Sequence, residues 1–140
     1  MSLAMSKSAR EAFLADVHVG IIAIPRTDGG PMAVPIWYDY EPGGDVRIIT
    51  NLGSRKGKLL QQAERISLVA QTEQLPYRYV SVEGPFRTTP TQPDELLAMA
   101  IRYLGDKQGR AYADASSDGG DSVVVHLKPE RWLSVDYGQA

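Results

Sequence analysis

The sequence predicts a mainly β fold, a six-stranded antiparallel barrel with peripheral α-helices. Short segments rich in β-branched and aromatic residues alternate with turns that contain Gly, Pro or Asp over most of the 140 residues. Helical spacing of apolar residues is confined to a few stretches. Closing hairpin-connected strands of this kind into a barrel removes the exposed sheet edges, so we expect a barrel rather than an open sheet.

The first half of the chain is expected to hold one helix and three strands. The capping-box pattern Ser8-Ala9-Arg10-Glu11 predicts a helix over residues 9–15 that covers one end of the barrel. Thr27-Asp28-Gly29-Gly30 and Glu41-Pro42-Gly43-Gly44-Asp45 have turn chemistry. The strands that these turns connect are predicted at residues 17–24, 32–40 and 46–50.

The second half is expected to hold three strand regions and further helices. Strands are predicted at residues 65–72 and 77–88, and a last strand region over 122–135 is interrupted at Lys128-Pro129-Glu130. Residues 94–104 have a helical period that Gly105 can end, and Asp94 and Glu95 form an acidic first turn rather than a catalytic carboxylate pair. Further helical turns at 109–115 and a loop at 116–120 follow.

Composition limits the function classes. A chain of this length is expected to form one domain, residues 1–140, with any cofactor site inside one barrel or between subunits. A formal net charge of −2 argues against nucleic acid as a partner. The chain has no cysteine and two histidines, which excludes a thiol nucleophile and argues against a protein-only metal site.

The N-terminal residues carry no apolar run long enough for a signal peptide or a membrane span. We therefore expect a soluble cytoplasmic protein with no membrane partner. Residues 1–5 are a candidate remnant of an expression vector, with Met5 a candidate natural start.

The stretch from Thr50 to Leu59 has the chemistry of a phosphate clamp. It places two hydroxyls, an amide, a glycine and three cations directly after an apolar strand, with Ser54 as the predicted N-cap of a helix that continues through Leu60. Backbone N–H groups and cationic side chains at such a turn suit a small anion. The alternative interpretation is a strand-to-helix turn whose basic residues are solvated.

Residues 50–56 also resemble the flavin-phosphate segment of the pyridoxamine 5'-phosphate oxidases and of the wider flavin and deazaflavin oxidoreductases. The resemblance continues through residues 65–69, 76–84 and 127–132, and covers roughly residues 10 to 137. It implies a split β-barrel that binds a flavin-type cofactor in a groove between two subunits of a homodimer.

The resemblance also assigns candidate cofactor contacts. Arg55 and Lys56 are the first candidates for phosphate ligands, Ser54 and Thr50 are donors, and Lys58 is a weaker candidate because one helical face cannot aim three cations at one phosphate. The strand that contains Val34, Pro35 and Trp37 is expected beside the isoalloxazine ring, and Tyr79 stands where the family has a flavin-binding glutamine. Trp37 is equally well interpreted as a core aromatic, and Tyr79 as an interface residue.

The implied function is transfer of hydride between the cofactor and a small organic substrate, with no residue assigned a catalytic role. The cofactor is F-420 or FMN, and the absence of the family's flavin-holding lysine, where this chain has Trp37 and Tyr38, favours F-420. True pyridoxamine phosphate oxidase activity is not expected, because the family's substrate-binding arginine and histidine near the C-terminus are missing. A non-catalytic flavin, deazaflavin or haem carrier is the alternative. His18 and His126 receive no role.

Overall fold

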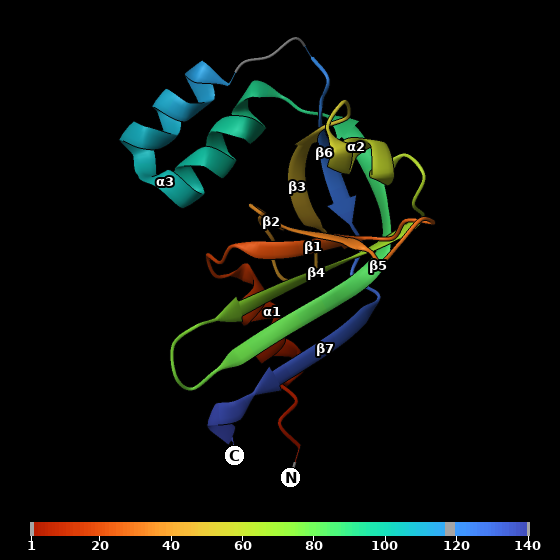
Figure 1. Ribbon diagram of the computed structural model, residues 1–140. Helices are drawn as coiled ribbons and strands as arrows, with labels where there is room; N and C mark the ends of the chain where they lie inside the picture. The colour runs from red at the N-terminus through yellow and green to blue at the C-terminus, as the bar shows by residue number, and fades with distance from the viewer. Residues whose placement is uncertain (1, 117–119, 140) are drawn as a thin grey trace.

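The computed structural model describes residues 2–116 and 120–139. Residues 117–119 of the predicted 116–120 loop, and Met1 of the N-terminal stretch, lie outside the described residues. Figure 1 shows a strongly curled sheet with one helix at its lower end and a pair of helical segments at its upper end. The elements are α1 (Lys7–Ala15), β1 (Gly20–Ile24), β2 (Met32–Ile36), β3 (Val46–Asn51), α2 (Arg55–Leu60), β4 (Arg65–Thr72), β5 (Arg78–Pro90), α3 (Pro93–Ala115), β6 (Ser122–Leu127), β7 (Arg131–Asp136) and η1 (Tyr137–Gln139).

The fold is the mainly β, antiparallel split barrel that the sequence predicts. Its strands are hydrogen-bonded in the order β2-β1-β4-β5-β6-β3, and β7 pairs with β5. The predicted strand region 122–135 is two strands, because residues 128–130 leave the sheet between them. β6 pairs with the end of β5, at residues 86–90, and β7 pairs with its beginning, at residues 78–83.

Gly84 lies where β5 passes from one half of the barrel to the other. A Cβ atom built on Gly84 would lie 1.8 Å from the carbonyl oxygen of Lys128, so only glycine fits. The N–H groups of Lys128 and Glu130 donate to the carbonyls of Pro85 and Glu83, at 2.9 and 3.0 Å. The 128–130 segment is therefore held against β5 at the bend.

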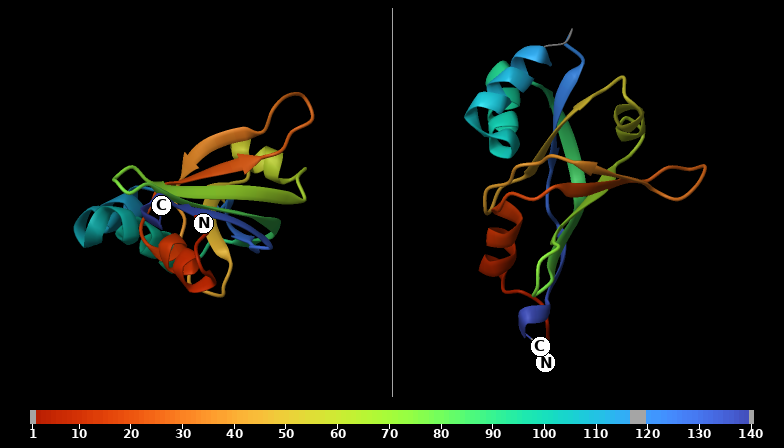
Figure 2. Two further views of the ribbon diagram at one scale, coloured as in Figure 1. Left: turned by 90° about the horizontal axis from the view of Figure 1, so that it is seen from below. Right: turned by 60° about the vertical axis from the view of Figure 1, so that its left-hand side comes forward.

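The barrel closes through a single bridge and stays open beside it. Asp39 and Arg47 exchange two backbone hydrogen bonds of 3.0 and 2.9 Å, and this bridge joins the segment after β2 to β3. No other pairing between these two segments is found among the described residues. The split is thus the space between β2 and the C-terminal half of β3, and Figure 2 shows these strands diverging.

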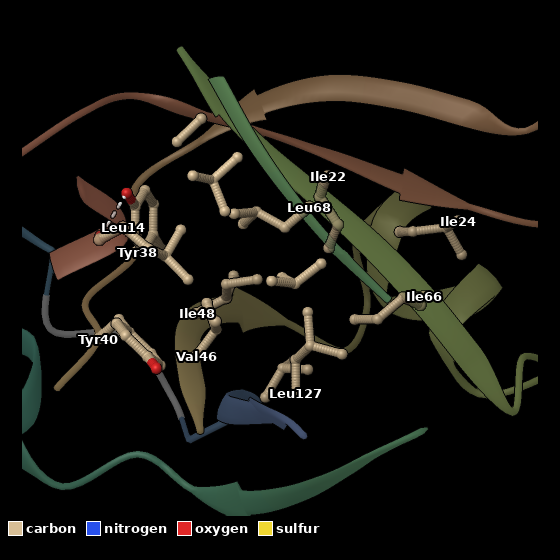
Figure 3. Close-up of a cluster of buried hydrophobic side chains, with 14 of the residues drawn as sticks. Leu14, Ile22, Ile24, Tyr38, Tyr40, Val46, Ile48, Ile66, Leu68 and Leu127 are labelled. Atoms are coloured by element: carbon tan, nitrogen blue, oxygen red, sulfur yellow. Dashed lines mark hydrogen bonds between the residues drawn. The ribbon is translucent and has the colours of Figure 1, made fainter. Parts of the chain in front are cut away.

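Alternation along the strands builds the core. The even-numbered residues of β1, β3, β4 and the first half of β5 point inward, and Ile22, Ile48 and Leu68 are at most 1% exposed. Tyr38 is fully buried and donates a 2.7 Å hydrogen bond to the carbonyl of Leu14 at the end of α1 (Figure 3). That contact fixes α1 across the barrel end, as predicted.

The long element α3 is a helical hairpin. Gly105 has non-helical angles, φ 83° and ψ 173°, and Figures 1 and 2 show two antiparallel segments on either side of the break. A Cβ on Gly109 would lie 2.7 Å from the backbone of Ile101, so the two segments approach closely. The predicted helix end at Gly105 and the helical turns at 109–115 are both present.

Several predicted boundaries were wrong for identifiable reasons. The first helix begins at Lys7, because the hydroxyl of Ser6, rather than that of Ser8, accepts the N–H of Ala9. β2 ends at Ile36 instead of residue 40, because the N–H of Tyr38 donates to the hydroxyl of Tyr103 and not to a strand. β1 begins at Gly20 instead of residue 17, and β5 extends to Pro90.

The N-terminal stretch contacts the barrel. The carbonyl of Leu3 accepts the N–H of Asp136 at 2.9 Å, and the N–H of Met5 donates to Ser134 Oγ at 3.0 Å. Met5 is 9% exposed and belongs to the core. Among the described residues, none of the helices has the length and apolar character that crossing a membrane requires.

Candidate functional site

A cavity of about 430 Å³ lies at the split of the barrel. Its walls come from the segment before β1, the end of β2, the end of β3, the start of α2 and the second segment of α3. The lining residues are Val19, Pro35, Ile36, Trp37, Ile49, Thr50, Asn51, Ser54, Lys56 and Tyr112. The cavity therefore brings together five of the nine predicted site residues: Pro35, Trp37, Thr50, Ser54 and Lys56.

The turn between β3 and α2 is built by side chains that cap the backbone. Asn51 Oδ1 accepts the N–H of Gly53 at 2.7 Å, and Ser54 Oγ accepts the N–H of Gly57 at 3.1 Å. A Cβ on Gly57 would lie 2.3 Å from the carbonyl oxygen of Asn51, so α2 packs directly on the turn. Ser54 is the N-cap, as predicted.

The three cations of this turn differ in position. Lys56 is half-buried and lines the cavity, whereas Arg55 and Lys58 are exposed and are not among its lining residues. Thr50 is 8% exposed, at the end of β3. Ser54 Oγ donates its single proton to the carbonyl of Asn51 at 2.6 Å, so that proton serves the turn itself. Lys56 is thus the cation aimed at the cavity.

Trp37 forms an aromatic wall. Its indole stacks on the ring of Tyr103, with centroids 5.0 Å apart and planes 4° apart, and Tyr112 lies tilted at 5.3 Å on the same indole. Trp37 is half-buried and lines the cavity. Both interpretations of Trp37 from the sequence therefore hold in part, because the side chain packs against other aromatic rings and also faces the candidate site.

The hydroxyl of Tyr103 holds α3 against the barrel. It lies 2.6 Å from the carbonyl oxygen of His18 and 2.8 Å from that of Tyr38, and accepts the N–H of Tyr38. The neighbouring Arg102 donates to the carbonyls of Ala15, Asp16 and Tyr38 at 3.0 to 3.1 Å. A cation at the C-terminal end of α1 is favoured by the helix dipole. These contacts position the aromatic wall.

Two other predicted residues, Val34 and Tyr79, lie outside this cavity. Val34 is half-buried and packs against the core from β2. Tyr79 is in β5, paired with Gln71 of β4 and Val135 of β7, and belongs to the outer face of the sheet. In a single chain the structure thus separates Tyr79 from the residues around Lys56.

The two histidines are held by local contacts. His18 Nε2 lies 3.0 Å from the carbonyl oxygen of Phe13, and its ring stacks on Phe13 at 4.4 Å. His126 Nε2 lies 2.8 Å from Thr89 Oγ1. Burial lowers the pKa of both imidazoles below the usual value, which favours their neutral forms. Neither residue lines the cavity at the split.

The described lining residues of this cavity include no carboxylate and no histidine. The side chains present offer an amide, hydroxyls, one ammonium group and aromatic or aliphatic surface. Such a set can bind an anion and a planar ring, but it contains no evident general acid–base pair. Tyr112 was missed from the sequence, because nothing in its helical neighbourhood indicates that a hairpin returns it to β3.

The fold and the cavity define a protein class: a split antiparallel β-barrel with an anion-suited turn beside an aromatic wall. The pyridoxamine 5'-phosphate oxidase family model matches residues 6–136, and the chain belongs to this family. None of the curated proteins matches the chain.

Solved structures share the fold at low sequence identity. A conserved hypothetical protein from Mycobacterium tuberculosis is similar, with TM-score 0.77 and 23% identity over 97% of this chain and 88% of that one. An F420 reductase gives TM-score 0.70 and 21% identity over 88% of this chain and 94% of that chain. An FAD-binding protein from Mesorhizobium loti gives TM-score 0.67 and 18% identity, over 93% of this chain and 94% of that chain.

Proposed function

We propose that the protein is an oxidoreductase that binds a flavin-type cofactor in the cavity at the split. It transfers hydride between that cofactor and a small organic substrate, and it works as a homodimer. The observation that carries this proposal is the placement of Lys56 and Trp37 in one cavity, a cation at one side and a flat aromatic wall at another. Membership of the pyridoxamine 5'-phosphate oxidase family supports it.

The residues present fit such a cofactor. The cavity of about 430 Å³ is within the range of small-molecule sites. Lys56 would pair with the phosphate, Thr50 would supply a hydroxyl, and Pro35 and Trp37 would shape the surface against the ring. The bound cofactor would carry the electrons, while these residues orient it and exclude water. Hydride transfer then needs no protein nucleophile.

The two residues that follow β2, Trp37 and Tyr38, favour F-420 over FMN as the cofactor. The flavin-holding lysine of the family is absent, and neither residue in its place supplies a cation. Trp37 stacks on Tyr103 and also contacts the tilted ring of Tyr112, and Tyr38 is fully buried with its hydroxyl donated to the carbonyl of Leu14. The similarity in fold to an F420 reductase agrees with this choice.

The outer face of the sheet supports the proposed homodimer. One row of residues crosses β2, β1, β4, β5 and β7 in register: Pro35, Ile21, Val69, Ser81 and Leu133. Ile21 is 37% exposed and Leu133 is 59% exposed. Tyr79 belongs to the adjacent row of the same face. A second copy of this chain would bury this apolar surface, which an isolated subunit exposes to water.

The test is calorimetric titration of the purified protein with FMN and with F-420. We expect F-420 to bind more tightly, and Lys56→Ala to weaken its binding by about 1.5–3 kcal/mol, the range of a charge-assisted hydrogen bond. Lys58→Ala is the matched control, since it removes the same charge from the same helix outside the cavity. Equal losses in both variants, or no binding of either cofactor, would contradict the proposal.

Binding without turnover would favour the alternative function, a carrier of the cofactor. The described residues around the cavity include no carboxylate and no histidine, and this supports that alternative. Stopped-flow oxidation of the bound reduced cofactor by small acceptors separates the two functions.

A further inference from the structure

Tyr112 borders two cavities. It lines the cavity at the split and also an adjoining cavity of about 600 Å³ between α3 and the ends of β3 and β5. Figure 1 shows α3 beside the upper ends of these strands. Ile49, Thr50 and Asn51, at the end of β3, line both cavities as well. The Tyr112 ring and the end of β3 therefore stand where the two spaces meet.

The second segment of α3 brings one large side chain to the barrel. Tyr112 is the only large apolar residue in the sequence from 106 to 115. None of these ten residues belongs to the buried core cluster, and Gly109 is the only one of them that is buried. The segment therefore adds little to the hydrophobic core, and Tyr112 is the residue through which it meets the aromatic wall.

The α3 hairpin fixes where Tyr112 lies. Gly105 allows the chain to turn back, and the missing side chain of Gly109 lets the second segment pack closely on the first. The first segment is itself bonded to the barrel through the hydroxyl of Tyr103. The Tyr112 ring is therefore held beside Trp37 by a frame that is anchored to the barrel.

The two tyrosines that contact the Trp37 indole differ in their surroundings. Tyr103 is half-buried and lies parallel to the indole, whereas Tyr112 is tilted by 50° and is 44% exposed. Because Tyr112 lines both cavities, part of its exposed surface faces them. Tyr112 is thus placed as a wall between two spaces rather than as a core residue.

We propose that Tyr112 is a positioning residue that separates the cofactor cavity from the adjoining cavity and shields the bound cofactor from small solutes on that side. Removal of its ring would join the spaces of about 430 and 600 Å³. The proposal rests on the proposed function, because the shielded molecule is the cofactor. Such a wall matters for hydride transfer, since exclusion of water from a reacting cofactor prevents side reactions.

Quenching of the cofactor's fluorescence by acrylamide, a small neutral solute, measures this shielding. The protein is saturated with F-420, or with FMN if FMN is the cofactor that binds. Tyr112→Ala should raise the quenching constant of the bound cofactor by about twofold or more, because the two spaces are then joined. Tyr112→Phe keeps the ring and should match wild type. Tyr137→Ala is the matched control, an equal truncation of a 51% exposed tyrosine outside both cavities.

Shielding the cofactor differs from holding it. A residue that only holds the cofactor changes the dissociation constant, which calorimetry measures, and leaves the quenching of the molecules that stay bound unchanged. A higher dissociation constant of Tyr112→Ala with unchanged quenching would therefore overturn the shielding role. Thermal unfolding of each variant verifies folding, and truncation of a residue that is nearly half exposed should leave the fold intact.

The separation of the two cavities is also tested without a cofactor. The chain has two tryptophans, so Trp132→Phe leaves Trp37 as the only indole that fluoresces. In this background, acrylamide should quench Trp37 more strongly after Tyr112→Ala, because the indole loses the ring that covers it on the side of the adjoining cavity. Tyr112→Phe and Tyr137→Ala should leave the quenching of Trp37 unchanged.

The outcomes separate this inference from the cofactor assignment. If neither cofactor binds, the proposed function fails, and the quenching of Trp37 decides alone: stronger quenching in Tyr112→Ala supports the separating wall, and unchanged quenching overturns it. If a cofactor binds, equal quenching of it in wild type and Tyr112→Ala would overturn the shielding while the proposed function stands. An equal rise in Tyr112→Ala and Tyr137→Ala would also overturn it, since the effect would then not belong to the cavities.

Discussion

The indole of Trp37 and the phenol ring of Tyr103 lie parallel, 5.0 Å apart between centroids. Because the Tyr103 hydroxyl is bonded to backbone groups of His18 and Tyr38, the hydroxyl end of the ring is held against the barrel. Trp37 therefore packs against a ring whose position the protein itself holds. A wall fixed before a ligand arrives lowers the ordering cost of binding.

Removal of the Tyr103 hydroxyl should loosen this wall. Tyr103→Phe keeps the stacked ring but leaves the N–H of Tyr38 without its acceptor, so we expect a loss of about 1–3 kcal/mol in the free energy of unfolding. Urea denaturation measures it. Tyr112→Phe is the control, because Tyr112 contacts the same indole and is 44% exposed. Equal stability of Tyr103→Phe and wild type would show that these bonds are not needed.

The oligomeric state should depend on the outer row of β1 and β7. Ile21→Glu and Leu133→Glu, separately, should convert the proposed dimer to a monomer at micromolar concentration, because each buries a charge in an apolar contact. Light scattering gives the mass directly. Leu75→Glu is a control with a 79% exposed leucine outside this row. A wild-type monomer that still binds cofactor would place the whole site within one barrel.

Activity should follow the cofactor rather than a titrating side chain. With reduced F-420 bound, we expect oxidation by enones or quinones and none by pyridoxamine phosphate, in a stopped-flow assay over a panel of acceptors. Trp37→Leu should slow transfer, because the wall that positions the ring is lost. Rapid turnover of pyridoxamine phosphate would contradict the proposed substrate preference.

Stability should fall as the solution becomes more acidic. Burial lowers the pKa of His18 below 6.5 in the folded protein, so the unfolded chain binds a proton more readily. This contribution to stability is present above the unfolded pKa and is lost as pH falls through the folded pKa. His18→Gln should therefore flatten the decline in the free energy of unfolding between about pH 7.5 and 5. His126, shifted in the same direction, should contribute independently.

The sequence was sufficient for elements whose signals are local. Ser54 could be predicted as a cap because its hydroxyl acts within one helical turn, and Gly105 because a glycine ends a helical period. The interruption of the last strand region at residues 128–130 was also predicted, but its cause was not, since it depends on the approach of Lys128 to Gly84 across the sheet.

The same division between local and tertiary signals applies to the candidate site. The turn that carries Lys56 is contiguous in sequence, and its chemistry can be recognised without coordinates. The contribution of Tyr112 comes from a hairpin that returns over β3, so only the tertiary arrangement places it beside Trp37. Lys56 lines the cavity and Lys58 does not, because of the way in which the six-residue helix α2 packs on the barrel, and this packing is not visible in the sequence.

The close approach at Gly84 places one steric constraint on two parts of the chain, position 84 and residues 128–130. Because a side chain at this position would meet the backbone of Lys128, a relative with another residue at 84 must carry a different path, and so a different length or composition, over 128–130. Paired changes at these two places would mark lineages in which the barrel bends differently. Such lineages would be expected to present a differently shaped outer face to a second subunit.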